Sequence, residues 1–175
     1  YDTGIVRAIA SAMEKYSPKY VVCDPVMIST SGAMLIKEET IKIMEEELFT
    51  RSTLITPNIM ESSKLAGFSI SSLDDMRKAA LQLYRKYGCS VLVKGGHLSG
   101  DAMCDILCAG GDIHEFALQR VKSSNVHGTG CTLSSAIASF LAKGEDIAGA
   151  VKYAKLYVRQ AIAFAAPMEL GKGGG

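Results

Sequence analysis

The sequence predicts an α/β layered fold, with a mostly parallel central sheet flanked by helices and an antiparallel edge hairpin. Two observations predict it. Short apolar runs alternate with segments of helical periodicity along residues 3–93, and two further runs then flank Gly110-Gly111. A crossover helix joins parallel strands, whereas a Gly-Gly turn joins antiparallel ones. Because no repeat, low-complexity tract or linker interrupts the chain, residues 1–175 are expected to form a single domain.

The spacing of apolar residues places each element in turn. Short apolar runs predict buried strands at residues 20–23, 53–56 and 89–93. Apolar residues three or four positions apart predict helices at residues 3–15, 41–48, 72–88, 131–143 and 146–165. Ser72 and Gly88 have the residue types expected at the start and end of the third helix. The hairpin strands are residues 103–108 and 112–118.

Composition limits the classes of function. The formal net charge is +1, so neither nucleic acid nor an anionic membrane is expected as the main partner. No apolar stretch reaches the roughly 18 residues that span a bilayer. Five cysteines occur without a C-x-x-C pair, which is typical of buried thiols in a reducing cytoplasm. The sequence begins at Tyr1 within a helical pattern and ends in glycines, so both ends are interpreted as cut.

Three predicted strands are followed by segments that suit ligand binding. They are Asp24-Pro-Val-Met, Thr56-Pro-Asn-Ile-Met-Glu and Lys94-Gly-Gly-His. In open α/β sheets ligands bind outside the carboxyl ends of the strands. These three segments are therefore expected to contribute to one site. His97 is assigned no role in it.

The segment from His127 to Cys131 is the strongest single signal. Gly128, Thr129 and Gly130 precede a helix, so backbone N–H groups and the helix dipole predict an anion site for a phosphate or a developing oxyanion. One alternative is an ordinary glycine turn before a helix that carries a buried cysteine. Another is a nucleophilic pair formed by His127 and Cys131, which lie four residues apart.

The other polar residues at the strand ends each have two interpretations. Lys94 is placed to reach a nucleotide phosphate or is a solvated lysine at a strand end. Asp24 is a candidate for holding Mg²⁺ through water or for capping a turn. Asn58 and Glu61 lie three residues apart at a helix start, which suits either a water-mediated metal site or a capping box.

Taken together, four motifs resemble the hydroxymethylpyrimidine/phosphomethylpyrimidine kinases of the ribokinase-like superfamily. The motifs are D-P-V-M at 24–27, T-P-N-x-x-E at 56–61, K-G-G-H at 94–97 and H-G-T-G-C-T at 127–132. The resemblance extends over essentially the whole chain and is specific because the motifs occur in the family's order. Sugar kinases of the superfamily usually carry Asp where this chain has Cys131, whereas the pyrimidine kinases and some pyridoxal kinases carry Cys.

The resemblance implies a ribokinase-like fold and a role for each matching residue. Cys131 would act as the base or would position the substrate hydroxyl, and Val26 would line the substrate pocket. The backbone of Gly128, Thr129 and Gly130 would form the anion hole. The expected cofactors are ATP and Mg²⁺, and the residues that would organise the nucleotide phosphates and the metal are Lys94, Asp24, Asn58 and Glu61.

The activity implied is ATP-dependent phosphorylation of 4-amino-5-hydroxymethyl-2-methylpyrimidine and then of its monophosphate. Pyridoxal kinase activity and a non-catalytic remnant that binds nucleotide or a partner protein are the alternatives. The family's glycine-rich N-terminal segment has no match in this chain, so by itself the chain is expected to bind nucleotide poorly. The resemblance also implies a homodimer.

Overall fold

The computed structural model describes residues 2–28, 32–96, 102–123 and 126–168. These residues contain a five-stranded sheet. The strands follow each other across the sheet in chain order. The first three, β1 (Val22–Cys23), β2 (Leu54–Ile55) and β3 (Ser90–Val93), are parallel to one another. The last two, β4 (Ala102–Ala109) and β5 (Asp112–Gln119), form an antiparallel hairpin that pairs with β3. This order confirms the predicted class of fold.

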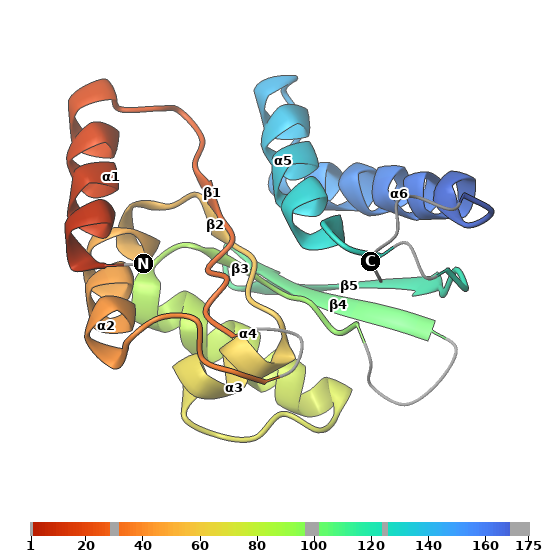
Figure 1. The fold of residues 1–175 in the computed structure, drawn as a ribbon, viewed down its shortest axis with the longest axis horizontal. Helices are drawn as coiled ribbons and strands as arrows, with labels where there is room; N and C mark the ends of the chain where they lie inside the picture. The colour runs from red at the N-terminus through yellow and green to blue at the C-terminus, as the bar shows by residue number, and fades with distance from the viewer. Residues whose placement is uncertain (1, 29–31, 97–101, 124–125, 169–175) are drawn as a thin grey trace.

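Helices cover the two faces of this sheet (Figure 1). The helices are α1 (Thr3–Tyr16), α2 (Glu38–Glu47), α3 (Ile59–Ala66), α4 (Leu73–Tyr87), α5 (Thr129–Ala142) and α6 (Ile147–Ala165), with a 3-10 turn at Phe49–Arg51. Helices α5 and α6 lie on one side of the sheet, and α3 and α4 lie on the other. Helix α1 packs against α2.

Alternation along the strands divides the core into two clusters. Leu54, Leu92 and Leu107 are fully buried and pack with residues of α5 and α6. Their neighbours Ile55 and Val91 belong to a second cluster, with residues of α1, α2 and α4. Successive side chains of a strand point to opposite faces, so a sheet covered on both faces needs continuous apolar runs. The continuous apolar runs in the sequence are therefore explained by a sheet that is covered on both faces.

Local signals fix the boundaries of α4 and of the hairpin. The Ser72 side chain accepts a hydrogen bond from Asp75 N–H at the start of α4, and Gly88 ends that helix with φ of 70°. Gly110 and Gly111 turn the hairpin with φ of 62° and 92°. Positive φ is costly for residues with a Cβ, so glycine at these positions specifies the turn. These predicted boundaries are confirmed.

The first strand is shorter than predicted, because its beginning pairs through a side chain. Val21 N–H donates to Thr53 Oγ1 at 3.0 Å rather than to a carbonyl of the neighbouring strand. The Val21 carbonyl still accepts from Thr53 and Leu54. The regular ladder therefore begins only at Val22.

None of the helices in the described part of the chain is long and apolar enough to cross a membrane. All five cysteines are free thiols, as predicted. Cys89 and Cys108 are buried, Cys23 and Cys104 are half-buried, and Cys131 is exposed. The expectation of buried thiols therefore fails for Cys131.

Replacement of Leu92 tests how the two clusters are assigned. We expect Leu92→Ala to lower the free energy of unfolding by about 2–5 kcal/mol, because it leaves a cavity between β3 and the α5–α6 layer. Urea denaturation of the intact protein measures the change. The matched control is Leu73→Ala, at a leucine that is 36% exposed, and we expect a loss below about 1 kcal/mol. Equal losses in the two variants would contradict the assignment.

Candidate functional site

The carboxyl ends of the three parallel strands meet at an ion pair. Asp24 directly follows β1, Thr56 follows β2 and Lys94 follows β3. Lys94 Nζ lies 2.7 Å from Asp24 Oδ1, and Thr56 Oγ1 donates to the same oxygen at 3.0 Å. The lysine and aspartate side chains are 18% and 11% exposed, so solvent screens the pair only partly. The structure thus brings together two predicted residues, Asp24 and Lys94, and adds Thr56.

The N-terminus of α5 lies directly against this ion pair. Gly128 is the N-cap, with φ of 79°, and as a glycine it offers no capping side chain. A Cβ on Gly130 would lie 3.5 Å from Asp24 Oδ2 and 3.6 Å from Lys94 Nζ. The N–H groups of a helix's first turn have no partner within the helix, and they carry its positive partial charge. This turn therefore offers N–H donors beside a lysine, as an anion site requires.

Cys131 occupies the same first turn and is exposed. The alternative of a glycine turn before a helix with a buried cysteine is thus contradicted, because the cysteine is exposed. Thr129 Oγ1 donates to the Val126 carbonyl at 2.9 Å, which fixes the start of the turn. His127 is also exposed, and no hydrogen bond given for the described residues joins it to Cys131. His97 lies outside the described residues.

Asn58 and Glu61 form a complete capping box at the start of α3. The Asn58 side chain accepts from Glu61 N–H, and Glu61 Oε2 accepts from Asn58 N–H, each at 2.9 Å. Glu61 Oε1 also accepts from Met27 N–H at 2.9 Å, and the residue is only 1% exposed. The capping alternative is therefore realised. Because both carboxylate oxygens accept backbone N–H groups, any magnesium role for this side chain stays a prediction.

Val26 has an unusual backbone conformation within this strand end. Its φ is 39°, which a β-branched residue rarely adopts, and 38% of the residue is exposed. Glu61 holds the next residue, Met27, by its N–H. Strained backbone persists where the surroundings over-determine it, and such positions gather at functional sites. The place of Val26 in a substrate pocket stays a prediction.

A buried ion pair behind the site was missed from the sequence. Asp105 of β4 and Lys155 of α6 are joined at 2.7 Å and are 6% and 7% exposed. Asp105 Oδ1 also accepts from Gly95 N–H at 2.8 Å, next to Lys94. The available signal was a lone aspartate in the apolar strand of residues 103–108. No signal in the sequence pairs this aspartate with Lys155, which lies 50 residues further along the chain.

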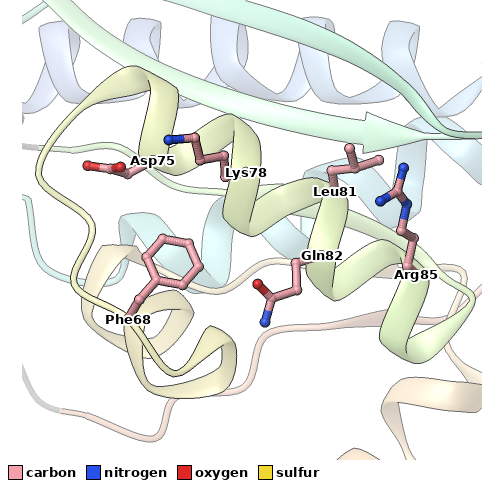
Figure 2. Close-up of a pocket in the computed structure, with 6 residues that line it drawn as sticks. All are labelled: Phe68, Asp75, Lys78, Leu81, Gln82 and Arg85. Carbon is pink, nitrogen blue, oxygen red and sulfur yellow. The ribbon is translucent and has the colours of Figure 1, made fainter.

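An open groove of about 550 Å³ lies elsewhere, along the outer side of α4. Figure 2 shows Lys78, Leu81 and Arg85 projecting from that helix, with Phe68 on the preceding connection. None of the predicted site residues lines this groove. Its walls are one exposed helix face and one loop, so it is separate from the strand-end site.

Two thiols in the core are held in the protonated form. Burial, and to a smaller extent the negative charge of Asp24, raises the pKa of Cys23 to about 12. Burial also raises the pKa of Cys89 to about 11. Because the thiolate is the nucleophile, neither residue is suited to react. Cys131 is the one cysteine whose exposure gives reagents free access.

Alkylation tests this difference among the thiols. With iodoacetamide at about pH 8, we expect Cys131 to be labelled in the native protein, and Cys23 and Cys89 only after denaturation. Peptide mass spectrometry over a time course measures each site. A Cys131→Ser variant should lose the fast label. Labelling of Cys89 as fast as Cys131 would contradict the described burial.

Comparison with known proteins gives consistent matches. The sequence profile of the phosphomethylpyrimidine kinase family matches residues 1–175. The chain is 44% identical over 173 residues to a bifunctional thiamine biosynthesis protein of Geobacter sulfurreducens, covering 99% of this chain and 35% of that protein. It is 38% identical over 171 residues to a hydroxymethylpyrimidine/phosphomethylpyrimidine kinase of Rhizobium meliloti, covering 97% of this chain and 64% of the relative.

Among solved structures, the fold is similar to the pyridoxal kinase from Staphylococcus aureus in complex with AMP-PCP. The TM-score is 0.86 at 30% identity, covering 93% of this chain and 59% of that chain. This chain thus spans less than two thirds of the length of each of these proteins.

Proposed function

The chain belongs to the phosphomethylpyrimidine kinase family, and on that premise we propose a function for the intact protein. It transfers the terminal phosphoryl group of ATP to the hydroxymethyl group of 4-amino-5-hydroxymethyl-2-methylpyrimidine, and then phosphorylates the monophosphate. The observation that carries the proposal is the Asp24–Lys94 pair against the first turn of α5. This arrangement places a cation, a carboxylate and helix N–H groups together at the carboxyl ends of the parallel strands.

This arrangement meets the main demand of phosphoryl transfer. Such reactions depend on positioning and on stabilisation of negative charge, with little covalent work for the protein. Lys94 carries three N–H donors, so it can hold Asp24 and a phosphate oxygen at the same time. The N–H groups of Gly130 and Cys131 belong to the first turn of α5, beside Lys94, and would bind the transferred phosphoryl group.

The residues present fit magnesium only as a largely hydrated ion. Among the residues that the structure describes, no cluster of three or more His, Cys, Asp or Glu side chains is suited to a metal. Mg²⁺ commonly keeps several waters and takes one or two carboxylates together with substrate phosphates. Asp24 would therefore hold it through water, with Asn58 and Glu61 keeping the adjacent strand end in place. When bound, the ion would neutralise phosphate charge.

Cys131 and Val26 complete the proposed site. Cys131 lies one residue after Gly130 and would accept the proton of the substrate hydroxyl or orient that hydroxyl. Val26 follows Asp24 by two residues and is exposed at the same sheet edge, where it would contact the pyrimidine ring. Thr129 and Gly128 shape the turn that presents the N–H groups.

Pyridoxal kinase activity is the second candidate. The similarity to the Staphylococcus aureus enzyme favours it. Pyridoxal also carries a primary alcohol on an aromatic ring, so the same phosphate site would serve. The choice between the two alcohols would therefore depend on residues that contact the ring, such as Val26, and not on the phosphate site.

An ADP-release assay on the intact protein with Mg-ATP tests the proposal. We expect turnover with the hydroxymethylpyrimidine, and a fall in kcat of about 100-fold or more in Cys131→Ala, since a positioned base contributes at least that factor. The control on the same helix is Ser139→Ala, whose exposed side chain bonds only within α5. We expect that variant to keep its activity.

The other outcomes of this assay are equally informative. Turnover with pyridoxal alone would replace the proposal by the second candidate. Failure of the folded protein to consume ATP with either alcohol would contradict a kinase and favour a non-catalytic remnant. Full activity of Cys131→Ala would remove this cysteine from the mechanism.

A further inference from the structure

We propose that Asp105 and Lys155 are positioning residues that set Lys94 for nucleotide phosphate by fixing the backbone of Gly95. This inference rests on the proposed function, in which Lys94 binds phosphate. Neither Asp105 nor Lys155 has a part in the chemistry described above. Both are buried and charged, and such a pair is weak evidence of stability by itself. Its contacts point instead to the turn that carries Lys94.

The carboxylate of Asp105 supplies a hydrogen-bond acceptor just beyond the end of the ladder between β3 and β4. The ladder between β3 and β4 has its last pair at Val93 and Ile106. Two residues after Val93, Gly95 N–H donates to Asp105 Oδ1 at 2.8 Å, so a side chain satisfies that donor. A hydrogen bond to a charged acceptor in a buried place is stronger than an ordinary one. The turn after β3 is therefore held tightly.

The space around Gly95 is also too small for a side chain. A Cβ at this position would lie 1.7 Å from the Cys104 carbonyl oxygen, a distance at which the backbone would have to move. Only glycine lets the chain approach β4 so closely. Gly95 thus lies close to the backbone of Cys104 and is also bonded to the carboxylate of Asp105.

Lys155 compensates the buried negative charge of Asp105. An unpaired buried charge is costly, and Lys155 Nζ supplies the opposite charge 2.7 Å from Asp105 Oδ2. The same ammonium donates to the Phe116 carbonyl of β5 at 2.7 Å. Helix α6 and both hairpin strands are in this way joined to the turn at Gly95.

The backbone of Lys94 is consequently fixed on both sides. Its own N–H donates to the Pro57 carbonyl at 2.9 Å, and the following N–H is held by Asp105. From that backbone the side chain reaches Asp24, with Nζ 2.7 Å from the carboxylate. A shift of the turn would move the ammonium relative to the first turn of α5, which lies against it.

Two charge-neutral double variants separate this role from stability. Asp105→Leu with Lys155→Met removes the ion pair and also the acceptor for Gly95 N–H. Asp105→Asn with Lys155→Gln removes the ion pair but keeps an acceptor oxygen of the same reach. Replacing a buried ion pair by apolar residues of similar volume is often neutral for stability. Denaturation of both variants in the intact protein identifies any remaining difference in folding.

Steady-state kinetics then report on Lys94. We expect Asp105→Leu with Lys155→Met (the Leu/Met variant) to raise the KM for ATP by about tenfold, because it loses one charge-assisted hydrogen bond. The KM for the alcohol should change by less than about twofold. The Asn/Gln variant should stay within about threefold for both. In a Lys94→Met background the Leu/Met change should add less than about twofold, because contacting residues are coupled. The proposal would be overturned if the Leu/Met change raised the KM for ATP equally with and without Lys94, or if both double variants raised it equally.

Hydrogen exchange tests the contact independently of any activity. We expect the Gly95 amide to exchange at least about tenfold faster in the Leu/Met variant and to keep its protection in the Asn/Gln variant. If the wild-type protein proved not to be a kinase, this contrast would still hold and only the proposed function would fail. Unchanged exchange at Gly95 in both variants would overturn the positioning role itself.

Discussion

The candidate site depends on the ion pair between Asp24 and Lys94. Asp24 follows β1 and Lys94 follows β3, so the pair joins the ends of two strands that lie on either side of β2. The lysine and aspartate are largely removed from water, and desolvation of both charges has to be offset by their attraction and by further polar partners. Thr56 donates to the same carboxylate oxygen, and the positive end of α5 lies beside its other oxygen.

Around this pair, buried carboxylates hold backbone where strands end. Glu61 accepts from the N–H groups of Asn58 and Met27 and so joins the segments after β2 and β1. Asp105 does the same for Gly95 after β3. Backbone donors that leave a sheet need new partners if they stay buried. Carboxylates supply strong ones, and they leave the exposed side chains of Val26 and Cys131 available to a ligand.

Local signals in the sequence were sufficient for much of the fold. The caps of α4 and the Gly-Gly turn act over a few residues, so Ser72, Gly88 and Gly110 mark their boundaries directly. The rule for strand ends also grouped Asp24 with Lys94 correctly. Partners far apart in the chain could not be predicted this way. The pairing of Asp105 with Lys155, and the second bond of Glu61 to Met27, depend on how helices lie on the sheet.

The most direct test is a crystal structure of the intact protein with Mg²⁺ and AMP-PCP. We expect the terminal phosphate to lie within hydrogen-bond distance of Lys94 Nζ and of the N–H groups of Gly130 and Cys131 at the start of α5. Asp24 should lie within one water of the metal ion. A nucleotide bound with its phosphates away from Lys94 and α5, for example in the groove along α4, would contradict a phosphate site at the strand ends.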